Sequence, residues 1–327
     1  MKMRKSLWKV LCLSLLIAFG PIAIAQNSIS VPSDSKFVLQ VDLQAIQTSK
    51  VGALLFSMAK KAAMDEIGKS VNSQEVTSEK IKEVLGMDPF EEIQGVVICA
   101  SDYENPEKSL LGMIRLKKTT GNIEGLLLGI PGYEKSEYRK YDIYSASPGD
   151  KAKVYGAVHK NKAGENTLIV GANQSSVTGL LDSLDAKSAE PKSLKSVDLS
   201  SDRKVMVHMQ ILELPLAKLG KGPQANIAAL LSSMTISLAE DGDELEVRAA
   251  MQTGSEKKAD QIRQSVQGLA AMVEIFASTD GQDEDVKNVL QFIKKVKVVQ
   301  DGTSVSVKVR VPSAEVAEMI KKEMNDN

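Results

Sequence analysis

Residues 296–324 read VKVVQDGTSVSVKVRVPSAEVAEMIKKEM, a complete strand–turn–strand–helix unit. Valines alternate with polar residues between Ser304 and Val311, so the predicted strand has one apolar face and one polar face. Asp301-Gly302 supplies the turn before this strand, and Pro312-Ser313 opens the helix after it. The helix carries its apolar residues on one stripe, formed by Val316, Ile320 and Met324. The chain therefore combines pleated strands with amphipathic helices.

Variants of this unit recur along the whole chain. The first half predicts a strand near 37–43, a helix over 49–66, a hairpin over 96–117, a helix over 120–130, three short strands and a closing helix. The second half restarts with a strand near 205–211 and ends with the unit quoted above. Because the hairpins are antiparallel and helices fall between groups of strands, we expect an α+β fold. Two similar halves are predicted, each an antiparallel sheet with helices packed mainly on one face. Periodicity leaves open whether the two sheets are separate or continuous.

The N-terminus has the pattern of a secretory signal peptide. A basic start is followed by an apolar run from Val10 to Phe19 and by small residues, with cleavage expected between Ala25 and Gln26. A retained membrane anchor is the alternative, but the apolar run is about half of the ~20 residues that a spanning helix needs. The predicted organisation is a signal peptide (1–25), a first α+β domain (26–186), a linker (187–202) and a second α+β domain (203–327). We expect a periplasmic or secreted protein with no transmembrane helix after signal removal.

The net charge restricts the kinds of binding partner, and the cysteine content shows whether disulfides can stabilise the fold. Removal of the signal peptide takes away four positive and no negative charges, so the formal net charge falls from −1 to −5. An acidic chain argues against nucleic acid as a partner. Only Cys99 then remains, which excludes an intramolecular disulfide. The fold must therefore depend on its aliphatic core.

The sequence contains no assembled reactive motif. His159 and His208 have no histidine or cysteine at ligand spacing, and both fall on the polar phase of their predicted strands, so we expect them to be exposed or half-exposed and predict no metal. The acidic run 280–285 lacks the spacing of an EF-hand loop and suits a helix start instead. No Gly-x-Ser-x-Gly or nucleotide-binding motif occurs, and Cys99 lies in a Val/Ile-rich strand. We predict no catalytic residue and no cofactor.

Tyrosine is distributed unevenly along the chain. All six tyrosines lie between residues 103 and 155. Tyrosine combines contact area with a hydrogen-bonding tip and is frequent at binding surfaces, but it is also an ordinary strand residue. Tyr141 shares a strand face with Ile143, which we expect to be buried. The remaining five form the candidate interaction surface: Tyr103, Tyr133, Tyr138, Tyr144 and Tyr155.

The overall pattern resembles a type of exported bacterial protein of unknown function. The resemblance rests on the signal peptide, on the opening VPSDSKFVLQVDL at residues 31–43, and on duplicated hairpin–helix units that close as residues 305–320 do here. It implies no catalytic residue and no ligand. The leading hypothesis is a non-enzymatic, envelope-associated or secreted binding protein whose partner is an envelope protein. The alternatives are a carrier that holds a hydrophobic, lipid-like small molecule between sheet and helices, and an exported hydrolase without a recognisable motif.

Overall fold

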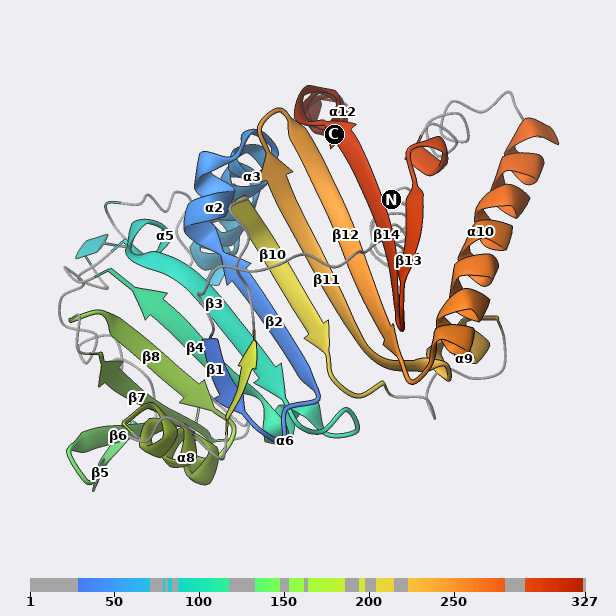
Figure 1. Ribbon diagram of the computed structural model, residues 1–327. Helices are drawn as coiled ribbons and strands as arrows, with labels where there is room; N and C mark the ends of the chain where they lie inside the picture. The colour runs from blue at the N-terminus through green and yellow to red at the C-terminus, as the bar shows by residue number, and fades with distance from the viewer. Residues whose placement is uncertain are drawn as a thin grey trace. The chain divides into compact units, whose positions relative to one another are not determined.

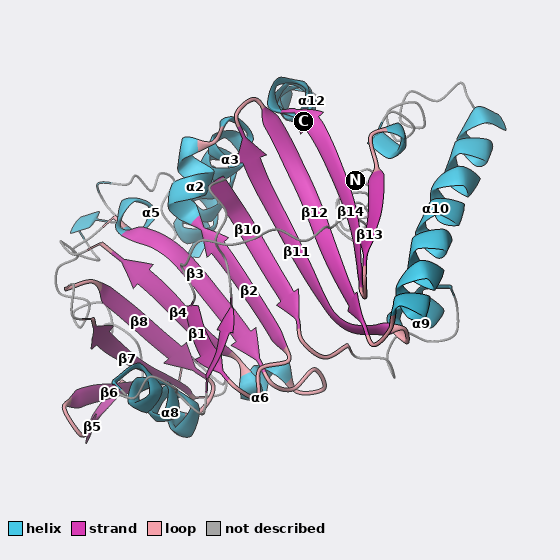
Figure 2. Cartoon of the chain, in the orientation of Figure 1, coloured by secondary structure: helices cyan, strands magenta, loops and turns pink. Residues whose placement is uncertain are grey.

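The computed structural model describes residues 29–70, 79, 82–83, 88–117, 133–147, 153–161, 164–185, 194–197, 204–214, 223–279 and 292–325. The chain divides into two compact units (Figures 1 and 2). The first unit spans Ser28–Val197, and the described part of the second unit lies within Asp198–Asn327. Each unit is an antiparallel sheet combined with helices, so the predicted α+β class is confirmed.

In the first unit, neighbouring strands follow the order β2-β3-β4-β8-β7-β6-β5. These strands are β2 (Phe37–Asp42), β3 (Ile93–Ala100), β4 (Leu111–Leu116), β5 (Glu134–Tyr138), β6 (Tyr141–Ala146), β7 (Val154–Lys160) and β8 (Asn166–Gly171). A separate antiparallel pair joins β1 (Ile29–Pro32) to β9 (Leu194–Val197). The helices are α2 (Leu43–Thr48), α3 (Lys50–Ser70), α5 (Pro89–Glu92), α6 (Pro106–Ser109) and α8 (Gln174–Asp185).

The core of the first unit lies between its sheet and α8. The strand register places Cys99, Leu111 and Gly171 in one row across β3, β4 and β8. A β-carbon added at Gly171 would lie 2.9 Å from Val177 of α8, so glycine allows the helix to approach the sheet closely. Val177, Leu180 and Leu181 are buried on α8, as their helical spacing predicts. Helix α8 therefore covers this face of the sheet.

In the second unit, the strand order is β10-β11-β12-β14-β13. Its strands are β10 (Lys204–Ile211), β11 (Leu231–Asp241), β12 (Glu244–Thr253), β13 (Lys297–Asp301) and β14 (Ser304–Pro312), and its helices are α9 (Pro223–Ala228), α10 (Glu256–Thr279) and α12 (Ser313–Asn325). Helix α10 packs through Ala259, Ile262 and Val266 against Val305 and Val307 of β14. The valine alternation that predicted β14 is thus confirmed, and so is the turn, in which Gly302 has a φ of 53°.

Some short strands lie where the residue pattern predicts none. Residues 194–197 fall inside the segment expected to be a linker (187–202), yet they form β9 and pair with β1. Strand β5 was also missed, because residues 134–138 (EKSEY) show no apolar alternation and four of the five are exposed at a sheet edge. The helix expected over 120–130, the acidic run 280–285, the predicted signal peptide and its cleavage site all lie outside the described residues.

Candidate functional site

The first unit contains a cleft beside α8, lined by helix residues between Ser175 and Ser183. It has a volume of about 270 Å³ and lies where the β1–β2 turn, the end of β3 and the start of β4 meet the helix. Seven serines line it: Ser33, Ser35, Ser101, Ser109, Ser175, Ser176 and Ser183. Leu111 and Leu180, both 2% exposed, give it an apolar floor. We call this site the serine-lined cleft.

Hydrogen bonds hold the walls of the serine-lined cleft in place. Asn173 caps α8 by accepting from the Ser176 backbone N–H at 2.8 Å, and its side-chain amide donates to the Lys108 carbonyl at 3.1 Å. On the opposite wall, the Tyr103 hydroxyl donates to the Lys36 carbonyl at 2.8 Å. These bonds join the helix start and the β1–β2 turn to the β3–β4 loop. The cleft is therefore largely preformed.

Cys99 lies among the residues of the cleft floor. Its side chain is 1% exposed, and Sγ lies 3.5 Å from the Leu111 carbonyl oxygen, to which the thiol donates. Burial raises the pKa of the Cys99 thiol to about 11. Because the thiolate is the nucleophilic form, this cysteine is chemically inert at neutral pH.

Four of the five candidate tyrosines lie together in the first unit, and the fifth does not. Tyr133, Tyr138, Tyr144 and Tyr155 belong to strands β5–β7 or to the residue before them, a group that we call the tyrosine meander. The Tyr133 and Tyr144 rings stack with centroids 6.0 Å apart, and Tyr144 is only 7% exposed. Tyr103 lies in the β3–β4 loop instead, where it supports the cleft wall. Position along the chain alone does not distinguish the β3–β4 loop, which carries Tyr103, from strands β5–β7, which carry the other tyrosines.

A cluster of titratable side chains joins the tyrosine meander to the end of α8. The Tyr141 hydroxyl donates to Asp185 Oδ1 at 2.8 Å, and Lys140 Nζ lies 2.9 Å from Asp185 Oδ2. Burial alone would raise the pKa of the Asp185 carboxyl, but these hydrogen bonds together hold it below its usual range. A second hydrogen bond joins the tyrosine meander to α8: the Tyr138 hydroxyl donates to Asp182 at 2.9 Å.

His159 belongs to the same cluster, and the expectation that it is exposed was wrong. It is 8% exposed, and its Nε2 lies 3.6 Å from Asp185 Oδ1. Burial lowers the pKa of His159, and the charge of Asp185 opposes this shift. Alternation along β7 predicted that the face carrying His159 is exposed to solvent. In the structure α8 covers this face, which carries Ala157 and His159. His208, in contrast, is partly exposed on β10, as expected.

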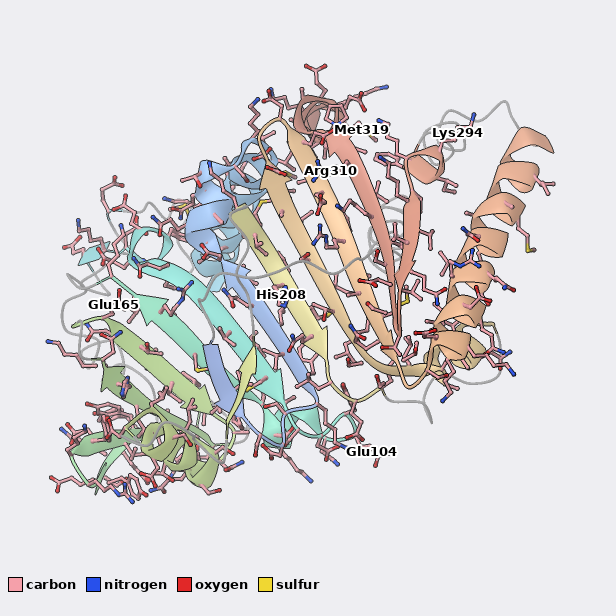
Figure 3. The ribbon with its side chains drawn as sticks, viewed as in Figure 1. Glu104, Glu165, His208, Lys294, Arg310 and Met319 are labelled. Atoms are coloured by element: carbon pink, nitrogen blue, oxygen red, sulfur yellow. The ribbon has the colours of Figure 1, made fainter. Side chains whose placement is uncertain are left out.

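The polar groups of the second unit form a different arrangement. Glu246 is 2% exposed on β12 and accepts from Arg310 Nε at 2.6 Å. Arg248 Nε lies 3.0 Å and Lys308 Nζ 3.7 Å from the same carboxylate. Figure 3 labels Arg310 on this sheet, where it also reaches Glu244 at 3.1 Å. Opposite charges on facing strands balance one another, so this arrangement, the Glu246 ladder, stabilises the sheet.

The described part of the chain contains neither a metal-binding cluster nor a helix able to span a membrane. Across those residues, no three His, Cys, Asp or Glu side chains gather closely enough to hold a metal ion. Of the helices described, none combines the length and the hydropathy that crossing a membrane requires.

Comparison with known proteins gives a distant structural likeness. No protein-family model matches the chain, and no curated protein matches it. Among solved structures, it is similar to crystal forms I, III and IV of TP0453, with 10%, 11% and 10% sequence identity. The alignments cover 89%, 91% and 89% of this chain and 95%, 100% and 97% of TP0453, with TM-scores of 0.38, 0.40 and 0.41.

Proposed function

We propose that this chain is exported, to the periplasm or beyond, and acts there as a non-enzymatic binding protein. The serine-lined cleft is the observation that carries the proposal, because it combines a recessed volume with several polar groups that converge on it. The basic and then apolar N-terminal sequence supports export. The ligand site is therefore assigned to the first unit.

Binding without catalysis agrees with the chemistry around the cleft. A hydrolase needs a nucleophile beside a general base. The thiol of Cys99 has a raised pKa, and His159 lies against Asp185 and Tyr141 at the far end of α8. An exported hydrolase is thus the less supported alternative.

A carrier of a lipid-like molecule is the second alternative. Such a carrier requires an enclosed apolar cavity, commonly of several hundred Å³. The serine-lined cleft has an apolar floor in Leu111 and Leu180, but its walls carry seven hydroxyl groups. Burying an apolar chain against these hydroxyls would remove water from them without replacing its hydrogen bonds. The cleft consequently favours a polar ligand.

The tyrosine meander is the surface that we propose for an envelope protein partner. Its rings lie beside cationic groups: Arg139 is 5.4 Å from the Tyr138 ring and Lys153 is 5.8 Å from the Tyr155 ring. Aromatic side chains next to cations are common at protein interfaces. Tyr144 contributes little area because Tyr133 stacks on it.

We also infer that the two units descend from one duplicated ancestor. The order β2-β3-β4-β8-β7 in the first unit corresponds to β10-β11-β12-β14-β13 in the second. In both units a helix follows the fourth of these strands directly: α8 follows β8, and α12 follows β14. Hairpin β5–β6 is then an addition to the first unit.

The test of the proposed function compares two glycine-to-leucine variants. Gly179 lines the cleft on α8, and an added β-carbon there meets no atom within 4 Å. Gly179→Leu should therefore fill the cleft without disturbing its walls. Gly268 on α10 has equally open surroundings but lies in the other unit, so Gly268→Leu is the matched control. Leucine also has a higher helix propensity than glycine, so both variants should fold.

The measurement is native purification of the exported protein from its own envelope, followed by mass spectrometry of the small molecules that stay bound. We expect one polar small molecule to accompany the wild type and Gly268→Leu and to be lost from Gly179→Leu. A molecule retained equally by all three proteins, or none retained by the wild type, would contradict the proposal. Retention of a long-chain lipid that Gly179→Leu abolishes would support the carrier instead.

A further inference from the structure

The charges around the serine-lined cleft restrict its ligand. Among the described residues that line it, Asp34 is the only one with a carboxylate side chain, and burial raises the pKa of the Cys99 thiol. No lysine, arginine or histidine occurs among the lining residues that the structure describes. A carboxylate or phosphate ligand would therefore meet one like charge and no opposite charge. The cleft suits a neutral or cationic ligand.

The hydrogen-bonding groups of the lining restrict it further. Each serine hydroxyl has one donor hydrogen and two acceptor lone pairs, and an ionised carboxylate only accepts. Ser175 already donates its hydrogen to Asn173 Oδ1 at 2.7 Å, so its hydroxyl can only accept from a ligand. Asp34 adds two more acceptor oxygens. A ligand with several O–H donors around its edge can therefore donate hydrogen bonds to these acceptors, whereas a ligand that only accepts cannot.

Size and surface complete the description of the ligand. A volume of about 270 Å³ corresponds to about nine water molecules at ~30 Å³ each. That space holds one substituted six-membered ring and not a long chain. Leu111, Leu180 and Ala100 offer aliphatic contacts to the C–H face of such a ring, and the described part of the lining contains no aromatic side chain. A flat aromatic ligand would find nothing on which to stack.

From these features, together with the proposed binding function on which the inference rests, we propose that the serine-lined cleft binds one neutral sugar residue. Its hydroxyls would exchange hydrogen bonds with the serines and donate to Asp34, and its C–H face would pack on the leucines of the floor. A single ring without aromatic stacking leads us to expect a dissociation constant in the millimolar range.

The test uses three sugars that share one ring and differ in charge. D-Glucose, D-glucosamine and D-glucose 6-phosphate are titrated into the mature protein, and backbone amide shifts are followed by NMR. We expect glucose and glucosamine to move the amides of Ser35, Ser176 and Gly179, and glucose 6-phosphate to bind at least about tenfold more weakly because of the charge of Asp34. Gly179→Leu should abolish these shifts, and Gly268→Leu should keep them.

A second variant protects the test from a folding failure. Asp34 lies on an exposed turn, so Asp34→Asn should fold, and it should reduce the preference for glucosamine over glucose 6-phosphate.

Equal or tighter binding of glucose 6-phosphate by the wild type, or absence of shifts with all three sugars, would overturn the sugar assignment. If envelope purification still yields another small molecule that depends on Gly179, the proposed function stands and only the ligand class is wrong. If neither experiment shows a ligand, both fail.

Discussion

The two units share a scaffold but place their polar groups differently. Both have the same order in five strands and cover one sheet face with a helix, α8 in the first unit and α10 in the second. In the second unit the polar side chains of the sheet balance one another, as Glu246 and Arg310 show. In the first unit polar groups gather at a strand end beside α8 and leave a cleft. The comparison shows that two units with the same order in five strands can arrange their polar side chains differently, with a cleft in one and a network of ion pairs in the other.

The largest expected effect tests whether the two helices support their units equally. Leu181 on α8 and Ile262 on α10 are both completely buried. Truncation to alanine at either position should lower the free energy of unfolding by about 3 kcal/mol, because it removes packed methyl groups and leaves a cavity. Urea unfolding measures the loss. Leu269→Ala, at a position 37% exposed on α10, is the control and should cost less than about 1 kcal/mol. A small cost at Leu181 alone would show that α8 supports its unit less than α10 supports the other.

A somewhat smaller effect is expected in the Glu246 ladder. Glu246→Gln removes the buried carboxylate that Arg310, Arg248 and Lys308 approach, so unfolding should become easier by about 2 kcal/mol. The cost stays moderate because Arg310 keeps its contact with Glu244. The exposed pair of Lys295 and Glu315 supplies the control, and Glu315→Gln should change stability by less than about 0.5 kcal/mol. If Glu246→Gln were neutral, the ladder would not be the stabilising feature of the second unit.

The smallest effect is a pH dependence specific to the first unit. Burial lowers the pKa of His159 below its ordinary value of 6.5, with Asp185, Lys140 and Tyr141 facing the ring. The unfolded chain therefore binds more protons than the folded protein as the pH falls below 6.5, and stability falls with it. The loss is at most about 1.4 kcal/mol per pH unit.

The pH measurement compares urea midpoints at pH 7 and pH 5.5 for the wild type and His159→Gln. The wild type should lose more stability than the variant over this interval. Asp185 does not affect this comparison. Because its pKa is lowered, its protonation changes the stability only at pH values below about 3.8. An identical loss in both proteins would show that the buried histidine does not control this dependence.

Much of the architecture followed from local patterns. Alternation predicted β14 because one of its faces packs on α10, and Gly302 marked the turn because a positive φ favours glycine. Strands β5 and β9 escaped prediction because they are short and lack an apolar face in sequence. His159 was misplaced for a related reason: when a helix covers the face that carries a polar residue, alternation no longer identifies the buried side.

The sequence by itself determined the α+β class, the antiparallel hairpins and the grouping of tyrosines, since each depends on residues close together in the chain. Only the tertiary structure decided the serine-lined cleft and the cluster around Asp185. Ser35, Cys99 and Ser176 come from three separate segments, and no spacing along the chain reports that a turn, two strand ends and a helix start converge. Their meeting depends on sheet register and on the approach of α8 that Gly171 permits.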